Sequence, residues 1–328
     1  MINIAIVGAT GLVGNMFLKV LEERNIKADS YTLFASSKSV GKKVVFMGKE
    51  YEVEELNENS FNNNRFNYAL FSAGKNVALK YGQIAAKNGC TVIDNSSCFR
   101  MDKSVPLVIP NVNMQDAYDS PSKIISNPNC STIQAIIPIS IIDKKYHVNR
   151  IIYSTYQAVS GAGKKGIDDL ENNSTTTFPY KILNNCIPQI GNFEENGYSE
   201  EELKMINETR KILHKNNLPV SATCVRVPIL NSHAESITIE TECDFKVEDI
   251  KTLLNNNDKI IVLDDTKRNI YPLNTFATGT DEVYVGRVRK DLHVPNTLSF
   301  WCVADNIRRG AATNAIEILE ELLKKETN

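Results

Sequence analysis

Short apolar runs alternate with amphipathic stretches in the first part of the chain. Residues 4–7 are wholly apolar, as in the central strand of a parallel sheet. From 11 to 24 the apolar residues recur at helical spacing, and residues 31–35 again favour a strand. Further predicted strands are 68–72, 91–93, 107–109 and 124–126, with a helix over 77–88. This alternation predicts an α/β fold with a doubly wound parallel sheet.

The pattern changes after residue 130, where longer segments alternate apolar and polar positions and few helices interrupt them. The predicted strands here are 150–159, 221–226, 236–242, 259–263, 283–289 and 297–303. They predict a second domain of α+β type with a mixed sheet. A last helix, over about 306–325, carries an apolar stripe and is expected to pack back on the first domain. The stripe consists of Ala312, Ala315, Ile316, Leu319, Leu322 and Leu323.

Composition and charge narrow the class of protein. The chain has 328 residues, enough for two domains with cores of their own. Its hydrophobic content of 42% and charged content of 23% are those of a globular protein. A net charge of −2 does not indicate nucleic acid or an acidic membrane as a partner. No apolar run approaches the ~20 residues that span a bilayer, and the strand pattern begins so early that we expect no signal peptide.

Seven cysteines are scattered along the chain, without a C-x-x-C pair or a cluster with histidines. In a large chain, an odd number of scattered cysteines favours reduced thiols. We therefore expect a cytoplasmic protein without a structural zinc site.

A glycine-rich loop, Gly8-Ala9-Thr10-Gly11-Leu12-Val13-Gly14, follows the first strand and opens the first helix. Its glycines suit a tight turn, close approach of backbone to a pyrophosphate, and close packing of helix on strand. In this position the loop predicts dinucleotide binding more strongly than a structural turn. We expect the cofactor to contact Gly8, Thr10, Gly11, Leu12, Val13 and Gly14.

The end of the second predicted strand bears on the choice of cofactor. NAD-preferring sites usually place Asp or Glu here to bind the ribose 2′-OH. This chain has Ala35-Ser36-Ser37-Lys38-Ser39, in which no carboxylate repels a 2′-phosphate. Ser36, Lys38 and Ser39 therefore favour NADP, the alternative being an ordinary polar loop.

Cys130 stands where a strand-like stretch gives way to a helix-like one, in Ser126-Asn127-Pro128-Asn129-Cys130-Ser131-Thr132. The first N–H groups of a helix have no internal partners, and its positive dipole end favours a thiolate over a thiol. Such positions can lower a cysteine pKa from ~8.5 towards neutrality. An activated thiol together with a nucleotide loop indicates redox chemistry through a thioester.

These motifs, in this order, resemble those of aspartate-semialdehyde dehydrogenases, and the resemblance runs from end to end of the chain. Besides the glycine loop and the Cys130 segment, the shared stretches are 94–101 (DNSSCFRM), 157–163 (QAVSGAG), Glu201-x-x-Lys204, 224–228 (CVRVP), His233 and 303–306 (VADN). The resemblance implies NADPH-dependent reductive dephosphorylation of L-aspartyl 4-phosphate to L-aspartate 4-semialdehyde. This reaction belongs to the biosynthesis of lysine and diaminopimelate, threonine and methionine.

The resemblance also implies roles for individual residues. Cys130 would be the nucleophile, His233 the acid/base group, and Gln157 the residue that orients the acyl group. Arg226 would bind the α-carboxylate, Glu201 the α-amino group, and Arg100 and Lys204 the phosphate. Ser160, Gly161 and Asn306 would lie against the nicotinamide end of NADP. The domains would be residues 1–130 with about 305–328, of Rossmann type, and a catalytic and dimerisation domain, 131–304, through which a homodimer is expected.

Physical chemistry supports several of these roles separately. A guanidinium can grip a carboxylate at two points, and the ordinary pKa of imidazole lies near neutrality. Glu201 and Lys204 would share one face of a helix, whereas Glu202 completes a capping box with Ser199. Pro138 should kink or end the helix after Cys130.

Two other functions remain open on the sequence alone. N-acetyl-glutamyl-phosphate reductases share the glycine loop and a cysteine thioester, but Asn129 stands where that family would have glycine. A non-catalytic NADP-binding sensor would not need Cys130 together with His233.

Lys38 departs from the resemblance, because arginine is expected to bind the 2′-phosphate and lysine lacks its planar fork.

Overall fold

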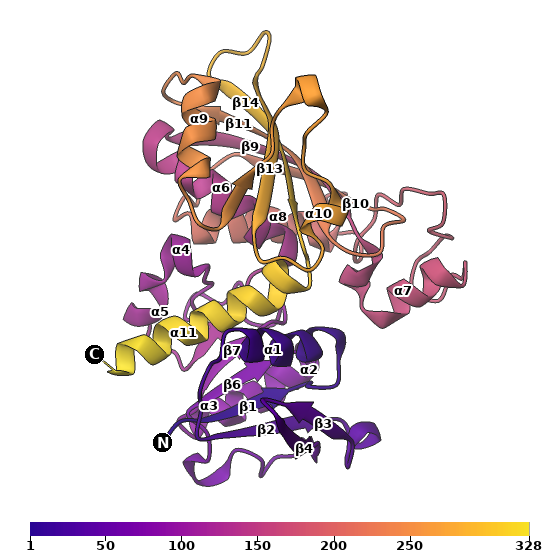
Figure 1. The fold of residues 1–328 in the computed structure, drawn as a ribbon, viewed down its shortest axis with the longest axis vertical. Helices are drawn as coiled ribbons and strands as arrows, with labels where there is room; N and C mark the ends of the chain where they lie inside the picture. The colour runs from indigo at the N-terminus through magenta and orange to yellow at the C-terminus, as the bar shows by residue number, and fades with distance from the viewer. Residues whose placement is uncertain (328) are drawn as a thin grey trace. The chain divides into compact units, whose positions relative to one another are not determined.

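The computed structural model describes residues 1–327 and divides into two compact units (Figure 1). One unit consists of residues 1–129 together with the C-terminal segment that begins at Ala311. The other consists of residues 130–310. Each unit is built around a six-stranded sheet.

The sheet of the first unit has the order β5-β2-β1-β6-β7-β8, and every pair of neighbours is parallel. This confirms the predicted doubly wound sheet. Its strands are β1 (Asn3–Val7), β2 (Ser30–Ala35), β5 (Glu54–Glu55), β6 (Tyr68–Phe71), β7 (Thr91–Asp94) and β8 (Ile124–Ser126). Helix α1 (Leu12–Glu23) follows β1, and α2 (Lys75–Val77), η3 (Ala78–Gly82) and α3 (Gln83–Lys87) together occupy the predicted helix 77–88.

Two local predictions in this unit need correction. The predicted strand 107–109 is wrong, because Leu107 forms only an isolated bridge to Ser126. Pro110 then begins the short helix α4 (Pro110–Asn113), which α5 (Gln115–Asp119) follows. The hairpin of β3 (Lys43–Phe46) and β4 (Lys49–Glu52) was not predicted. Its two turn residues, Met47 and Gly48, both have positive φ, and methionine is an unusual residue for such a turn.

The C-terminal helix α11 (Asn314–Thr327) packs on the first unit, as predicted. Ala315, Ile316 and Leu319 are buried in one cluster with Ile4 of β1 and Phe17 of α1. The helix, yellow in Figure 1, thereby completes the core of a unit whose other residues lie near the start of the chain.

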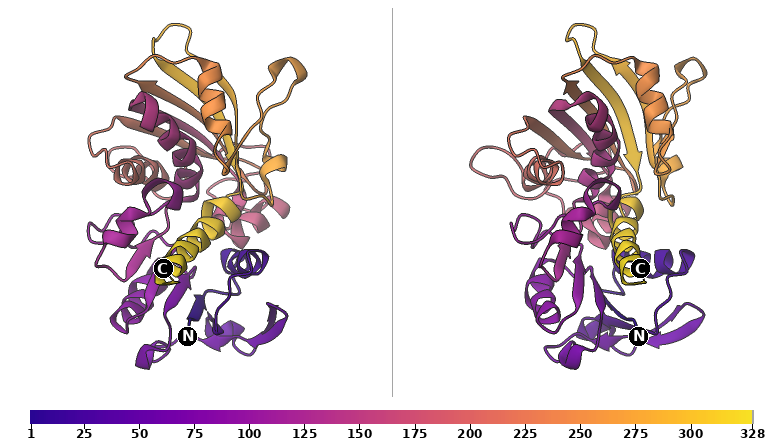
Figure 2. Two further views of the ribbon diagram at one scale, coloured as in Figure 1. Left: turned by 60° about the vertical axis from the view of Figure 1, so that its left-hand side comes forward. Right: turned by 90° about the vertical axis from the view of Figure 1, so that its left-hand side faces the viewer.

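The second unit contains the predicted mixed sheet, with the order β10-β9-β11-β14-β13-β12. β11 is antiparallel to both of its neighbours, whereas β10 is parallel to β9 and β12 to β13. The strands are β9 (Val148–Gln157), β10 (Val220–Arg226), β11 (His233–Thr241), β12 (Ile260–Val262), β13 (Val283–Lys290) and β14 (Thr297–Ala304). Helices α6 (Cys130–Tyr146) and α9 (Val247–Asn255) lie side by side against this sheet, and α8 (Glu200–Ile212) contacts β10 (Figures 1 and 2).

Helix α6 continues through Pro138 to Tyr146, so of the two expected effects of the proline, a kink or an end, the helix end does not occur. Proline lacks the N–H that would bond to the carbonyl four residues earlier, which is that of Gln134. The thiol of Cys302 on β14 donates to this carbonyl instead, with 3.5 Å between Sγ and O. The side-chain amide of Gln134 donates to the carbonyl of His233 over 3.3 Å. The interruption in the helix is therefore used to attach α6 to the sheet.

Candidate active site

Cys130 is the first residue of α6. Its side chain is partly exposed, whereas the following Ser131 and Thr132 are buried. The thiol therefore lies at the end of a helix where backbone N–H groups lack intrahelical partners. This is the local geometry that the sequence predicts for it.

His233 is the first residue of β11 and is fully buried. Its Nδ1 accepts a hydrogen bond from the backbone N–H of Ala158 at 3.0 Å. Because Nδ1 is an acceptor, the neutral ring carries its proton on Nε2. Nε2 has no hydrogen-bond partner among the described residues. The proton-bearing nitrogen is thus the one left available for a substrate.

The electrostatic surroundings of His233 differ from the expectation of a group that titrates near neutrality. Burial first, and the charge of Arg226 second, lower the pKa of His233 to about 3. The hydrogen bond from the N–H of Ala158 also disfavours the charged ring, because a protonated Nδ1 would place its own N–H against that of Ala158. His233 is therefore neutral across the physiological range of pH.

Arg226, the last residue of β10, is 4% exposed. Its Nη1 donates to the carbonyl of Ala158 over 2.6 Å, and its guanidinium lies 5.8 Å from the ring centre of Phe178. Burial lowers the pKa of Arg226, while the charges of Glu201 and Cys130 raise it. One residue, Ala158, thus orients both His233 through its N–H and Arg226 through its carbonyl. Ala158 lies in the 157–163 stretch, but no side-chain chemistry could have singled it out, since only its backbone takes part.

Gly161 brings the two groups into one small space. A Cβ atom at Gly161 would lie 2.8 Å from Nη1 of Arg226 and 3.3 Å from Nε2 of His233. Nearby, the side-chain amide of Asn306 donates to Ser160 over 3.1 Å and its oxygen accepts from the N–H of Ser232 at 2.9 Å. The three residues expected at the nicotinamide end, Ser160, Gly161 and Asn306, therefore belong to one cluster beside His233.

Gln157, Glu201 and Lys204 form a chain of polar contacts. The amide of Gln157 donates to Oε1 of Glu201 and the ammonium of Lys204 to Oε2, both over 3.0 Å. Glu201 is 4% exposed, so Gln157 and Lys204, rather than water, supply hydrogen bonds to its carboxylate. The neighbouring Glu202 forms the predicted capping box with Ser199 and also accepts from the N–H of Cys224 at 3.0 Å. Adjacent acids on α8 thus have different surroundings.

The glycine loop lies entirely in the first unit. The N–H of Gly8 donates to the carbonyl of Phe34 over 2.8 Å. A Cβ at Gly8 would lie 2.3 Å from the carbonyl oxygen of Ser72, and one at Gly14 only 2.0 Å from that of Gly8. Gly11 precedes α1 and supplies no side-chain cap. The first N–H groups of α1 can therefore face a ligand phosphate directly.

The remaining predicted residues of the first unit lie at the end of β2 and after β7. Ser36 and Lys38 are exposed, whereas Ser39 is buried and accepts a hydrogen bond from Thr10 over 3.3 Å. Arg100 is 7% exposed and donates from Nη2 to the carbonyl of Asn95 over 2.9 Å. Its predicted phosphate-binding role remains a prediction.

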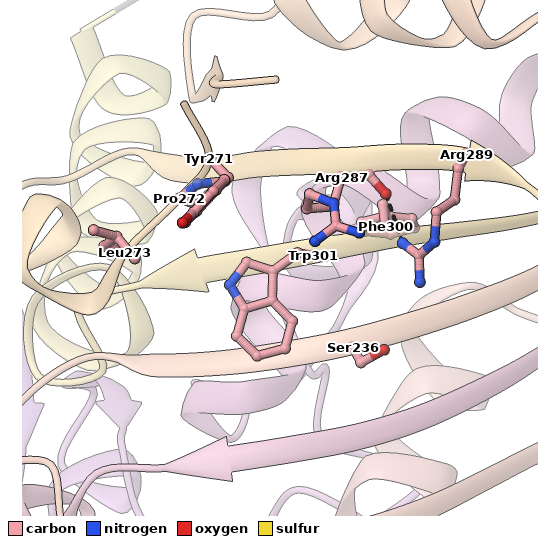
Figure 3. A pocket seen from close by; sticks show the side chains of 8 residues that line it. All are labelled: Ser236, Tyr271, Pro272, Leu273, Arg287, Arg289, Phe300 and Trp301. Atoms are coloured by element: carbon pink, nitrogen blue, oxygen red, sulfur yellow. Dashed lines mark hydrogen bonds between the residues drawn. The ribbon is translucent and has the colours of Figure 1, made fainter. Parts of the chain in front are cut away.

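A pocket on the sheet of the second unit involves none of these residues. Figure 3 shows the indole of Trp301 with Arg287 above it and Arg289 farther along β13, beyond Phe300. Its lining consists of Ser236, Tyr271, Pro272, Leu273, Arg287, Arg289, Phe300 and Trp301. Across residues 1–327, no group of three His, Cys, Asp or Glu side chains could hold a metal ion. In the same range, no helix is both long and apolar enough to cross a membrane.

Comparison with known proteins connects both units with one enzyme family. Residues 3–120 match the family described as semialdehyde dehydrogenase, NAD binding domain, and residues 140–309 match semialdehyde dehydrogenase, dimerisation domain. The chain is 50% identical to an aspartate-semialdehyde dehydrogenase of Aquifex aeolicus, over 98% of each chain.

Solved structures agree with this match. An aspartate semialdehyde dehydrogenase II of Vibrio cholerae, complexed with ASA, superposes with a TM-score of 0.95 at 42% identity, covering 99% of this chain and 98% of the other. An aspartate semialdehyde dehydrogenase of Candida albicans with NADP gives a TM-score of 0.78 at 25% identity, covering 99% of each chain.

Proposed function

The chain belongs to the aspartate-semialdehyde dehydrogenase family, and from this premise we propose that it reduces L-aspartyl 4-phosphate to L-aspartate 4-semialdehyde with NADPH. The observation that carries the proposal is the arrangement in the second unit. A cysteine at a helix start, a buried arginine and a neutral histidine with an available N–H lie in one unit, with Arg226 and His233 both next to Gly161.

Cys130 would act as the nucleophile. Its thiolate attacks the acyl carbon of the substrate, the new S–C bond forms, and the C–O bond to phosphate breaks with its electron pair leaving on phosphate. The product of this step is a thioester on Cys130. The start of α6 stabilises the thiolate, and the nearby charge of Arg226 acts in the same sense.

The residues of the first unit fit a dinucleotide. Any side chain at Gly8 or Gly14 would collide with backbone, so the loop can only exist as a bare cradle before α1. Ser36, Lys38 and Ser39 would hold the 2′-phosphate of NADP, and the Candida albicans relative with NADP supports this choice. When bound, the nicotinamide supplies the hydride that reduces the thioester carbonyl.

His233 would act through Nε2. In both tetrahedral stages on Cys130 the former carbonyl oxygen carries negative charge, and an N–H aimed at that oxygen stabilises it. A neutral ring with its proton on Nε2 suits this task. Collapse of the second tetrahedral species releases the aldehyde and restores the thiolate of Cys130.

The charged residues would recognise the rest of the substrate. Arg226 uses one nitrogen for the carbonyl of Ala158, while its Nε has no partner among the described residues. Nε and Nη2 could therefore grip the α-carboxylate as a fork. Glu201 would bind the α-amino group, Gln157 would orient the acyl group, and Lys204 and Arg100 would bind phosphate.

The assay that tests this function is phosphate-dependent reduction of NADP with aspartate 4-semialdehyde, run beside N-acetyl-glutamate 5-semialdehyde and beside NAD. We expect turnover with the first aldehyde and NADP. Turnover only with the acetylated aldehyde would support the reductase alternative, although the relatives reported above are aspartate-semialdehyde dehydrogenases. Absence of turnover with either aldehyde would favour a sensor.

We also expect a homodimer, since residues 140–309 match a dimerisation domain. The partner would cover the sheet face that carries the pocket of Figure 3. Tyr156 is 39% exposed there, and its ring centre lies 5.4 Å from that of Trp301. Sedimentation analysis should show a dimer that Trp301→Glu converts to monomer.

In a cell the enzyme would act in the cytoplasm and supply the lysine and diaminopimelate, threonine and methionine branches. The proposed compartment rests on the odd number of scattered cysteines in a large chain, which favours reduced thiols. The gene should therefore restore growth, without added diaminopimelate, threonine or methionine, to a bacterium that lacks this activity.

A further inference from the structure

The segment between β14 and α11 is a tight turn, of which the roles above use only Asn306. It contains a π-helical turn, η6 (Arg308–Thr313). The carboxylate of Asp305 accepts the N–H groups of Ile307 and Arg308, both at 2.9 Å, and the N–H of Gly310 donates to the carbonyl of Asp305 over 2.9 Å. π-Helical turns often occur at functional sites, so the contacts of this turn are relevant to function.

Gly310 lies directly against Cys130. A Cβ atom built on Gly310 would stand 2.7 Å from Cβ of Cys130, 3.1 Å from its Cα and 3.3 Å from its carbonyl oxygen. Carbon atoms that are not bonded meet at about 3.5–4.0 Å. All three atoms belong to the nucleophile residue, and none is the mobile end of a long side chain. A side chain at Gly310 would therefore have to displace Cys130 itself.

Backbone conformation does not explain this glycine. Nine other glycines have positive φ, which is the usual reason for a glycine, but Gly310 is not one of them. An L-residue could adopt its backbone angles. What the structure requires of residue 310 is space next to Cys130, since the three atoms nearest to its Cβ all belong to Cys130.

Hydrogen bonds and an ion pair also anchor the turn, so Gly310 cannot easily move away from Cys130. Arg309 is 1% exposed and its Nε donates to the carbonyl of Asp281. The Nε of Arg308 lies 2.8 Å from the carboxylate of Asp281. The N–H of Gly279 donates to Asp305 over 2.8 Å. These contacts attach residues 305–309, directly before Gly310, to residues 279–281, so a collision at Gly310 would be relieved mainly at Cys130.

We propose that Gly310 is a positioning residue for the nucleophile: its bare Cα, fixed by the anchored turn, sets the place and direction of the Cys130 thiol. The proposal rests on the proposed function, in which this thiol attacks the acyl carbon. A displacement of about 1 Å at a reacting group can lower a rate by roughly 10²-fold. One methyl group at Gly310 would produce a displacement of that order.

Gly82 offers a matched control. It ends the other π-helical turn of the described residues, η3, and is buried like Gly310. A Cβ at Gly82 would meet Phe99 at 3.7 Å and Val92 at 3.9 Å, which are ordinary contacts. Gly82→Ala therefore adds the same methyl group to the same kind of turn without a collision.

The experiment compares Gly310→Ala with Gly82→Ala in the full chain by kcat, KM for aspartate 4-semialdehyde, melting temperature and NADPH binding. It adds the rate at which iodoacetamide alkylates Cys130, located by peptide mass spectrometry because Cys186 and Cys243 are exposed. For Gly310→Ala we expect kcat to fall by roughly 10²-fold, as for a misplaced reacting group. KM and NADPH binding should change little, and alkylation of Cys130 should change with kcat. Gly82→Ala should resemble the unmodified protein in every measurement.

Unchanged kcat and alkylation in folded Gly310→Ala would overturn the proposal, and so would a lower melting temperature with unchanged reactivity of the folded fraction. If Gly310→Ala does not fold, Asp281→Asn tests the same idea by loosening the anchor without adding atoms. Its kcat and Cys130 alkylation should then fall together, and their constancy would contradict the proposal. Failure of the proposed function looks different: the unmodified protein would lack turnover, while alkylation of Cys130 would still respond to Gly310→Ala.

Discussion

Glycines in the two units leave space for different neighbours: backbone in the first unit and reactive residues in the second. In the first unit, Gly8 and Gly14 leave space for backbone: a Cβ on either would strike a carbonyl oxygen, at 2.3 Å and 2.0 Å respectively. In the second unit, Gly161 and Gly310 leave space for reactive side chains, those of Arg226, His233 and Cys130. The first pair shapes a surface that any dinucleotide could use. The second pair defines where particular atoms must stand, so the chemistry depends on the second unit and the electron carrier on the first.

Cys130→Ser should have the largest effect on this division of work. Turnover should be abolished, because an alkoxide forms far less readily than a thiolate, while NADPH binding stays nearly intact. Steady-state kinetics and fluorescence titration with NADPH measure the two properties. Loss of the nucleophile should cost more than the ~10²-fold that a typical acid–base group contributes. Retention of more than about one hundredth of the activity would therefore rule out covalent catalysis at Cys130.

Gly14→Ala should give the converse result. Its Cβ would stand 2.0 Å from the carbonyl oxygen of Gly8, so the loop must open and NADPH binding should be lost. Alkylation of Cys130 by iodoacetamide should continue at the original rate in the folded protein. Tight NADPH binding by this variant would show that the cofactor does not use the loop.

His233→Asn should lower kcat by about 10²–10³-fold, the usual contribution of one hydrogen-bond donor to an oxyanion. The pH dependence sharpens the role. Since burial and Arg226 lower the pKa of His233 to about 3, the ring stays neutral from pH 5 to 9. No limb of the kcat/KM profile in that range should therefore disappear in the variant. A limb near neutrality that vanished with His233 would show that the ring does titrate there.

Lys38→Asp should change the choice of cofactor by a smaller amount and leave the second unit unaffected. A carboxylate at the end of β2 would repel the 2′-phosphate of NADP and could bind the 2′-OH of NAD. The ratio of kcat/KM values for NADP and NAD should shift towards NAD. Lys38 is exposed, so folding should not change, and an unaltered ratio would place the ribose end elsewhere.

Glu235→Gln should have the smallest effect, and on stability. Glu235 is fully buried on β11, and neither carboxyl oxygen has a partner among the described residues. Burial first, and the charge of Glu201 second, raise its pKa well above 4.5. The folded protein thus keeps a proton that the unfolded chain releases above that pH, and stability falls as pH rises through this range. We expect the variant to melt about 2–4 °C higher at pH 8, roughly 1 kcal/mol for domains of this size, and no difference at pH 4.

Two differences between the expected and the observed fold lie at prolines. The run at 107–109 is apolar enough for a strand, but Pro110 begins a helix and the run makes only one bridge. Pro138 was expected to kink or end α6, yet Cys302 supplies a donor for the carbonyl that the proline leaves unpaired. Residues 134 and 302 are far apart in the chain, so no local pattern could reveal that compensation.

Features that depend on neighbours along the chain could be predicted: the alternation of strands and helices, the glycine loop, Cys130 at a helix start, and the capping box of α8. Hydrophobic period, turn chemistry and helix caps act over a few residues and can be read there. Three features became visible only in the folded protein: Ala158 binds both His233 and Arg226 through its backbone, His233 stays neutral, and Gly310 lies against Cys130. Each of these depends on burial and on atoms brought together from distant parts of the chain, which is the information that close packing adds.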